Sequence, residues 1–186
     1  MVAEAKAEAD ARELPLRVMF QDEARFGRIN DPKRCWSPQG TRPTVGKQII
    51  REYTYAYGAV SPRDGAADFL ILPVMTAVAM NLFLKEVGQR HEGEFILMIY
   101  DGAPCHSPGA LDIPENMTVR TLPPYSPELN PLENIWDDMR EKFFPNIVFE
   151  SMEAVENKVS EACLYYETHP DTARSITAFK WIKDIL

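Results

Sequence analysis

The chain has 186 residues, of which 45% are hydrophobic and 26% are charged, and it carries a formal net charge of −8 at pH 7. This length and composition are typical of one globular domain with a sizeable core, and they exclude an intrinsically disordered protein. No apolar run approaches the roughly 18 residues of a membrane-spanning helix, and three cysteines without CxxC spacing favour neither a disulfide framework nor a zinc site.

The N-terminal residues differ in character from the rest of the chain. Residues 3–13 are good helix formers without a consistent apolar stripe. They are charged and rich in alanine, unlike a signal peptide, so we expect a cytoplasmic protein with no membrane partner. We interpret residues 1–14 as a linker or remnant helix and residues 15–186 as the folded domain.

The first predicted strand covers residues 16–22 and ends in an acid. One face of this strand carries Leu16, Val18, Phe20 and Asp22, while Glu23 points to the opposite face. A basic stretch follows, because residues 25–51 contain one acid and seven cations: Arg25, Arg28, Lys33, Arg34, Arg42, Lys47 and Arg51. In an acidic chain this stretch is either an ordinary solvated hairpin or a local surface for nucleic-acid phosphates.

The middle of the chain predicts an α/β order. Strands at residues 53–60 and 68–72, joined by a turn at 61–65, continue an antiparallel unit of three strands. A helix at 76–90, capped by Thr76, crosses to residues 95–100, whose six consecutive apolar residues indicate a buried central strand. Residues 118–122 supply a fifth strand, and Asp101 directly follows the fourth.

Residues 122–140, LPPYSPELNPLENIWDDMR, place Glu133 on the first turn of a helix. Asn130 is the expected N-cap and Pro131 the first helical residue. Glu133 lies at the edge of the apolar stripe, where its carboxylate either returns to the Asn130 amide in a capping box or belongs to a site. The stripe consists of Leu132, Ile135, Trp136, Met139 and Phe143. Two more helices are predicted, at 151–168 and at 171–185.

Asp22, Asp101 and Glu133 together have the chemistry of a metal site. Hard cations such as Mg²⁺ or Mn²⁺ prefer a few carboxylates with water and substrate phosphate, and two such ions promote in-line phosphoryl transfer. Crowded carboxylates raise one another's pKa, so their convergence favours a cation among them. We therefore predict that the three lie close enough to share one or two ions. Asp137, one turn beyond Glu133, is either an auxiliary ligand or part of a solvated helix face.

Three segments, QDEARFGR, YDGAPCH and LPPYSPELNPLENIW, resemble the signature blocks of DDE-type transposases of the bacterial insertion-sequence branch of the Tc/mariner superfamily. They occur in the family's order across residues 16–185. The resemblance implies an RNase H-like (retroviral-integrase-like) fold, with a central mixed five-stranded sheet flanked by helices. It also identifies Asp22, Asp101 and Glu133 as the catalytic, metal-binding triad, holding two Mg²⁺ or Mn²⁺ ions for cleavage and transfer of DNA strands.

The implied partners are DNA, as transposon ends and target, and further copies of the protein in a homodimer or larger transposase assembly associated with the nucleoid. Candidate DNA contacts are the cations Arg25, Arg28, Lys33, Arg34, Arg42 and Lys47. Two alternatives stay open: a non-catalytic transposase relic that acts as an interaction module, and another RNase H-like nuclease.

The sequence departs from the family's pattern in two places. Gly102 stands where the family usually has asparagine, and the chain lacks the N-terminal helix-turn-helix region that reads terminal repeats, which predicts a catalytic half or a decayed copy. His106 matches the family's histidine but is also consistent with a packing role. Cys105 beside His106 has no third orienting group or oxyanion motif, which disfavours a cysteine hydrolase.

Overall fold

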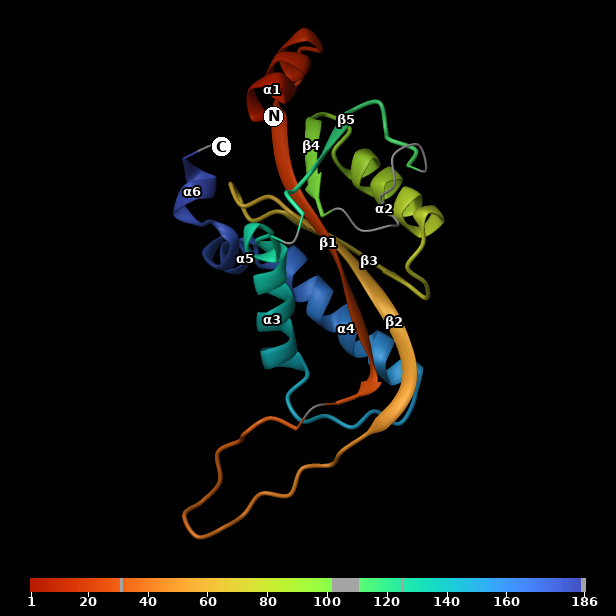
Figure 1. The fold of residues 1–186 in the computed structure, drawn as a ribbon, viewed down its shortest axis with the longest axis vertical. Helices are drawn as coiled ribbons and strands as arrows, with labels where there is room; N and C mark the ends of the chain where they lie inside the picture. Colours follow the sequence, from red (N-terminus) through yellow and green to blue (C-terminus); the bar gives the residue numbers. More distant parts are fainter. Residues whose placement is uncertain (31, 102–110, 125, 185–186) are drawn as a thin grey trace.

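The fold is built on one mixed sheet of five strands in the order β3-β2-β1-β4-β5 (Figure 1). The computed structural model of the protein describes residues 1–30, 32–101, 111–124 and 126–184. Its strands are β1 (Leu16–Ile29), β2 (Ile49–Val60), β3 (Ala67–Leu72), β4 (Phe95–Tyr100) and β5 (Met117–Thr121). Strands β1, β2 and β3 pair antiparallel, whereas β4 pairs parallel with both β1 and β5. The predicted mixed five-stranded sheet and its antiparallel unit are confirmed.

Helices cover both faces of this sheet because successive strand residues point to opposite sides. Met19 and Tyr57 pack with α2 (Ala77–Arg90) on one face. Phe20 and Ala56 pack on the other face with α3 (Leu132–Phe143), α4 (Met152–Thr168) and α5 (Pro170–Thr177) (Figure 1). No helix among the described residues has both the length and the apolar character to cross a membrane.

Strands β1 and β2 extend beyond their predicted apolar segments. Arg25 pairs with Tyr55 and Gly27 with Tyr53, so the polar half of β1 continues the antiparallel ladder. An apolar pattern does not mark this half, because partner-strand hydrogen bonds rather than burial keep it extended. Beyond the pair, residues 30 and 32–48 form a long arm that leaves the sheet (Figure 1). Trp36 on this arm is fully exposed.

The prediction of one final helix over residues 171–185 is wrong. The structure has α5 and a separate α6 (Lys180–Lys183), with Phe179 in an extended conformation between them. Ala173 and Ile182 are both fully buried, yet nine residues correspond to two and a half helical turns. An unbroken helix would place these two side chains on opposite faces, so the break allows both to reach the core.

The N-terminal residues form α1 (Val2–Ala11), which contacts β1 and β4. Ala5 and Ala9 are fully buried, one helical turn apart. The prediction that this segment lacks an apolar stripe therefore did not account for these two alanines. Their small side chains allow α1 to approach the sheet closely. The assignment of residues 1–14 to a linker or remnant helix stays a prediction.

A charged cluster joins the end of α2 to β1 and β3. His91 Nε2 lies 2.7 Å from Asp68 Oδ2, and His91 Nδ1 lies 3.1 Å from Glu94 Oε2. Arg90 pairs with Asp68 at 3.2 Å, and Arg17 pairs with Glu94. The hydrogen bond to Asp68 raises the pKa of His91 above its ordinary value, although burial opposes the rise. The cluster is therefore most stable with His91 protonated.

Candidate active site

The three predicted acids line one pocket of about 540 Å³. Asp22 comes from β1, Asp101 directly follows β4, and Glu133 lies on the first turn of α3. In the parallel ladder Phe20 pairs with Ile99, and continuing this register by two residues brings Asp101 level with Asp22. The fold therefore brings together carboxylates from three distant parts of the sequence. Their role as metal-binding catalytic residues stays a prediction.

One buried side chain fixes the start of α3 against β1. Asn130 Nδ2 donates to the Gln21 carbonyl at 2.9 Å, and Asn130 Oδ1 accepts from the Leu132 N–H at 3.2 Å. These partners are the residues immediately before Asp22 and Glu133. A single asparagine thus links the backbones that carry two of the three acids, and sequence analysis had assigned it only a capping role.

The start of the helix differs slightly from the prediction. The helix begins at Leu132 with Pro131 as its N-cap, one residue later than expected. Asn130 nevertheless has extended dihedrals and accepts the N–H two residues ahead, as a capping side chain does. The capping-box interpretation of Glu133 is wrong, because the Asn130 N–H donates to the Pro127 carbonyl at 2.9 Å. The Glu133 carboxylate faces the pocket instead.

A buried tryptophan orients the first acid. Trp136 Nε1 donates to Asp22 Oδ2 at 3.0 Å. The indole fits here because Asp22 pairs with Gly58 across the β1–β2 ladder, and a Cβ at Gly58 would lie 2.8 Å from the Trp136 ring. The sequence pattern predicts only a packing role for Trp136, as part of the apolar stripe. Its indole N–H is the signal that could have indicated a role in the site. A buried indole usually finds a hydrogen-bond acceptor, and Trp136 lies one helical turn from the predicted site residue Glu133.

Burial and mutual repulsion make the pocket unfavourable for three ionised acids. Burial, followed by the charges of Glu133, Glu23 and Asp101, raises the pKa of Asp22 to about 8, against one opposing backbone hydrogen bond. Burial also raises the pKa of Glu133; the charge of Arg140 opposes this rise, while Asp101 adds to it. A cation in the pocket would offset both effects.

The donor set fits Mg²⁺ or Mn²⁺ in chemistry, because each prefers carboxylate oxygens. Across the described ranges, however, no three His, Cys, Asp or Glu side chains are close enough to form a ready metal site. The prediction that the acids lie close enough to share ions is therefore not met in the metal-free arrangement, although they share a pocket. Repulsion between like charges favours this separation.

A second buried group lies beside Asp22. The Gln21 side chain is fully buried, and neither of its amide atoms has a hydrogen-bond partner among the described residues. Leaving such a group unpaired costs about 1–3 kcal/mol. Alternation of strand residues puts Gln21 on the face of β1 opposite to Asp22, so it does not open into the carboxylate pocket.

The neighbouring acids of α3 have structural partners. The Asp137 side chain is 81% exposed and pairs with Arg140 at 3.5 Å, which matches the solvated-face interpretation rather than that of an auxiliary ligand. Asp138 accepts a hydrogen bond from the Tyr166 hydroxyl, which lies on α4. The remaining candidates of the second segment, Gly102, Cys105 and His106, lie outside the described residues.

The predicted DNA contacts divide into two groups. Arg28 donates from Nε to the Phe149 carbonyl at 3.0 Å and from Nη2 to the Glu150 carbonyl at 2.8 Å, and it pairs with Glu52. Arg28 therefore ties β1 to the segment before α4. The others are exposed: Arg25 on β1, and Lys33, Arg34, Arg42 and Lys47 on the arm. Contact with DNA stays a prediction for all six.

Comparisons with known proteins agree with this architecture. Residues 17–156 match the family model described as DDE superfamily endonuclease. An uncharacterized protein, y4pE/y4sA of Sinorhizobium fredii (strain NBRC 101917 / NGR234), is 38% identical over 104 residues, covering 55% of this chain and 77% of that protein.

Solved structures share the fold at low sequence identity. A pre-cleavage Mos1 transpososome has a TM-score of 0.63 and 17% identity, covering 99% of this chain and 60% of that chain. The Mos1 mariner paired-end complex with Mn has a TM-score of 0.60 and 17% identity, covering 99% and 61%. The chain thus spans about three fifths of these Mos1 chains. The fold is the RNase H-like fold of these transposase structures.

Proposed function

Because the chain belongs to the DDE superfamily of endonucleases, we propose that it is the catalytic domain of a Tc/mariner-type transposase, which cleaves DNA and transfers strands at transposon ends. The observation that carries this proposal is the single pocket lined by Asp22, Asp101 and Glu133. Further support comes from the fold shared with Mos1 structures solved as strand-transfer and paired-end complexes, the latter with a transposon end.

In this proposal the three carboxylates hold one or two Mg²⁺ or Mn²⁺ ions. Mos1 paired-end complexes have been solved with Mn and with Mg. Such ions supply Lewis-acid stabilisation of the attacking and leaving oxygens in phosphoryl transfer. Asp22 must give up its proton when it becomes a ligand, because its pKa is about 8 in the metal-free pocket. The affinity for the metal ion should therefore rise with pH through the neutral range.

The surrounding side chains have positioning roles. Trp136 holds Asp22 Oδ2 through its indole N–H and so limits the rotation of this carboxylate in the pocket. Asn130 fixes the start of α3 relative to β1, so that Glu133 stays on the Asp22 side of the sheet. These contacts limit the movement needed to bring the acids around a cation.

Residues 15–186 form the catalytic domain in this proposal, and residues 1–14 are a linker or remnant helix. The domain works on DNA at the nucleoid in the cytoplasm, as a homodimer or within a larger transposase assembly. The Mos1 structures described as paired-end complexes support an assembly of this kind.

Nicking of a supercoiled plasmid tests the proposal. The wild-type chain should convert the plasmid to open circles with Mg²⁺ or Mn²⁺ and not with EDTA. Asp101→Asn and Glu133→Gln should abolish nicking, whereas Glu141→Gln, an exposed acid on the same helix, should leave it unchanged. A folded wild-type chain that leaves the plasmid supercoiled under all metal conditions would instead identify a non-catalytic relic. Equal cleavage of RNA–DNA hybrids would point to a general RNase H-like nuclease.

A further inference from the structure

A second pocket, of about 250 Å³, lies between β1, α3 and the base of the arm. Three cations line it: Arg25 of β1, Lys33 of the arm and Arg140 of α3. None of the described residues that line it is an acid, although the whole chain carries a net charge of −8 and Arg140 also pairs with Asp137 at 3.5 Å. We call it the basic pocket. Its charge makes it a site for an anion.

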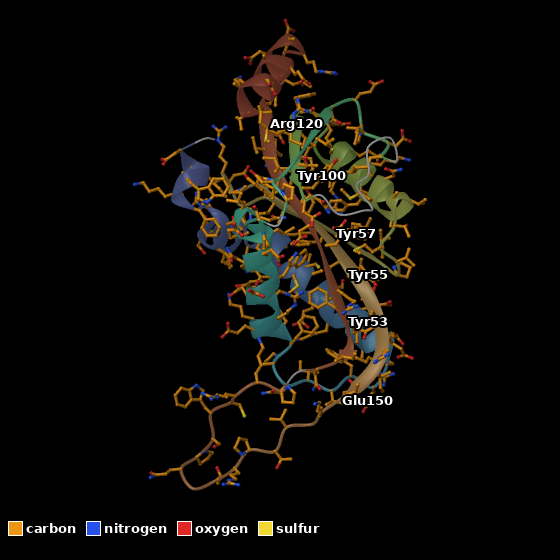
Figure 2. The ribbon with its side chains drawn as sticks, in the orientation of Figure 1. Tyr53, Tyr55, Tyr57, Tyr100, Arg120 and Glu150 are labelled. Carbon is orange, nitrogen blue, oxygen red and sulfur yellow. The ribbon has the colours of Figure 1, made fainter. Side chains whose placement is uncertain are left out.

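Aromatic rings hold the two guanidinium groups in place. The Arg25 guanidinium lies 4.4 Å from the centroid of the Tyr53 ring, and that of Arg140 lies 5.6 Å from the Phe26 ring. Figure 2 shows Tyr53 on β2, nearer the arm than Tyr55 and Tyr57. Cation–π contacts of this kind orient the planar fork of donors but leave its edge available to a ligand.

Hydrogen bonds fix the base of the arm beside these cations. Asn30 Nδ2 donates to the Gly46 carbonyl at 3.0 Å and to the Ile147 carbonyl at 3.1 Å. The Lys33 backbone exchanges two hydrogen bonds with the Asn146 side chain, at 2.8 and 3.1 Å. The third cation of the pocket, Lys33, is thus anchored through its backbone.

The basic pocket and the carboxylate pocket are neighbours along the same two elements. Arg25 follows Asp22 by three strand residues, or about 10 Å at the usual strand rise, and alternation puts its side chain on the opposite face of β1. Arg140 follows Glu133 by seven helical residues, or about 10 Å at the usual helical rise. The charge of Arg140 also acts on Glu133, where it opposes the rise in pKa that burial causes. Glu133 and Arg140 lie on one face of α3, about two turns apart, so an extended ligand that follows this face can reach both pockets.

We propose that the basic pocket binds a backbone phosphate of the DNA strand that enters the carboxylate pocket, a short way along the strand from the scissile phosphate. This inference rests on the proposed function and adds Arg140 to the DNA-contacting residues. The two pockets lie about 10 Å apart along α3, a distance that a short stretch of one strand can span. A phosphodiester suits the site because guanidinium forks match phosphate geometry and the contact reads no bases.

Salt-dependent binding tests the pocket without requiring catalysis. The anisotropy of a fluorescent 30-base-pair duplex is measured with the full chain in EDTA at several salt concentrations. Arg25→Gln and Arg140→Gln should each weaken DNA binding roughly threefold to tenfold. Each should also reduce the slope of the logarithm of the association constant against the logarithm of the salt concentration by about 0.9, the value for one lost phosphate contact. Arg140→Lys should retain most of the slope.

Arg174→Gln is the matched control, because Arg174 also pairs with an acid three residues earlier on a helix, Asp171 at 3.0 Å. It should leave affinity and slope unchanged. If Arg25→Gln and Arg140→Gln behave like this control, the proposal is overturned. The two substitutions lie on different elements. If Arg140→Gln does not fold, the affinity and salt slope of Arg25→Gln still test the phosphate site.

Oligothymidylates of two to eight nucleotides, with Mn²⁺ present, test the distance between the pockets. Affinity for the wild type should increase at the length at which one strand reaches both pockets, and this increase should vanish in Arg140→Gln. An increase of equal size in both proteins overturns the proposal. If plasmid nicking fails for the wild type while the salt slopes still fall in the variants, the proposed enzyme function is wrong and the phosphate site remains.

Discussion

Replacing Asp22 by asparagine should stabilise the metal-free protein, and the gain should grow with pH. The substitution removes a charge that burial and neighbouring acids disfavour. It retains an oxygen that can accept the 3.0 Å hydrogen bond from Trp136 Nε1. The asparagine side chain has almost the same shape as that of aspartate. A change in the free energy of unfolding therefore reports the loss of charge rather than a change in packing.

The magnitude follows from the pKa of Asp22, which rises from its ordinary 3.8 to about 8 on folding. Between these values the folded chain holds a proton that the unfolded chain has lost, so the wild type loses stability as pH rises. Each pH unit corresponds to about 1.4 kcal/mol. The advantage of Asp22→Asn should therefore increase by about 2–3 kcal/mol between pH 6 and pH 8, a relative rise in Tm of roughly 5–10 °C.

Urea denaturation of both proteins in EDTA at pH 6, 7 and 8 measures this difference. Comparing the two proteins at each pH cancels every titration that they share. Mg²⁺ or Mn²⁺ at pH 8 should then stabilise the wild type and have little effect on Asp22→Asn. A difference in unfolding free energy that does not change with pH would refute the burial and repulsion inferred for Asp22.

Four further outcomes are expected. Gly58→Ala should cost about 1–3 kcal/mol and shift the fluorescence of Trp136, because the new methyl meets the indole, whereas Gly93→Ala, with open space around it, should do neither. Hydrogen bonding raises the pKa of His91 in the folded chain. The stability that protonated His91 contributes is therefore complete below about pH 6.5 and is lost as pH rises through the higher pKa of the folded state. His91→Asn should destabilise the chain more at pH 6 than at pH 9 in thermal melts. Gln21→Met should raise the free energy of unfolding by about 1 kcal/mol in urea titrations, since it removes two unpaired buried amide atoms, and a loss of stability would indicate that the amide has a partner. An end-bearing duplex and a scrambled duplex should bind with similar weak affinities that fall together with salt, and a preference for the end would show base reading by this domain.

Much of the fold follows from local patterns in the sequence. The six apolar residues 95–100 predicted a buried central strand, and β4 is fully buried over Phe95–Tyr100. The sequence predicts helix starts at Thr76 and Ser151, and each of these side chains accepts a hydrogen bond from the backbone N–H three residues ahead. The resemblance carried by the three segments is confirmed by the family match over residues 17–156. These features succeed because strand burial, capping and family motifs are written in neighbouring residues.

Local patterns failed where a distant partner decides the structure. The polar half of β1 is extended because it pairs with β2, and the last helix breaks because Ala173 and Ile182 must both face the core. The capping box at Glu133 was a sound local expectation, but the carbonyl of Pro127 already accepts the Asn130 N–H. In each case the competing contact comes from tertiary packing or from the geometry of a turn.

The sequence by itself determined which acids to consider, because Asp22, Asp101 and Glu133 each follow a recognisable structural signal. Only the tertiary structure decided how they are held and charged. The indole of Trp136 reaches Asp22 because Gly58 on the opposite strand leaves room for it, and Asn130 joins two segments that lie 109 residues apart. The high pKa of Asp22 likewise depends on burial and on charges brought together from other elements, and both arise only when the chain is folded.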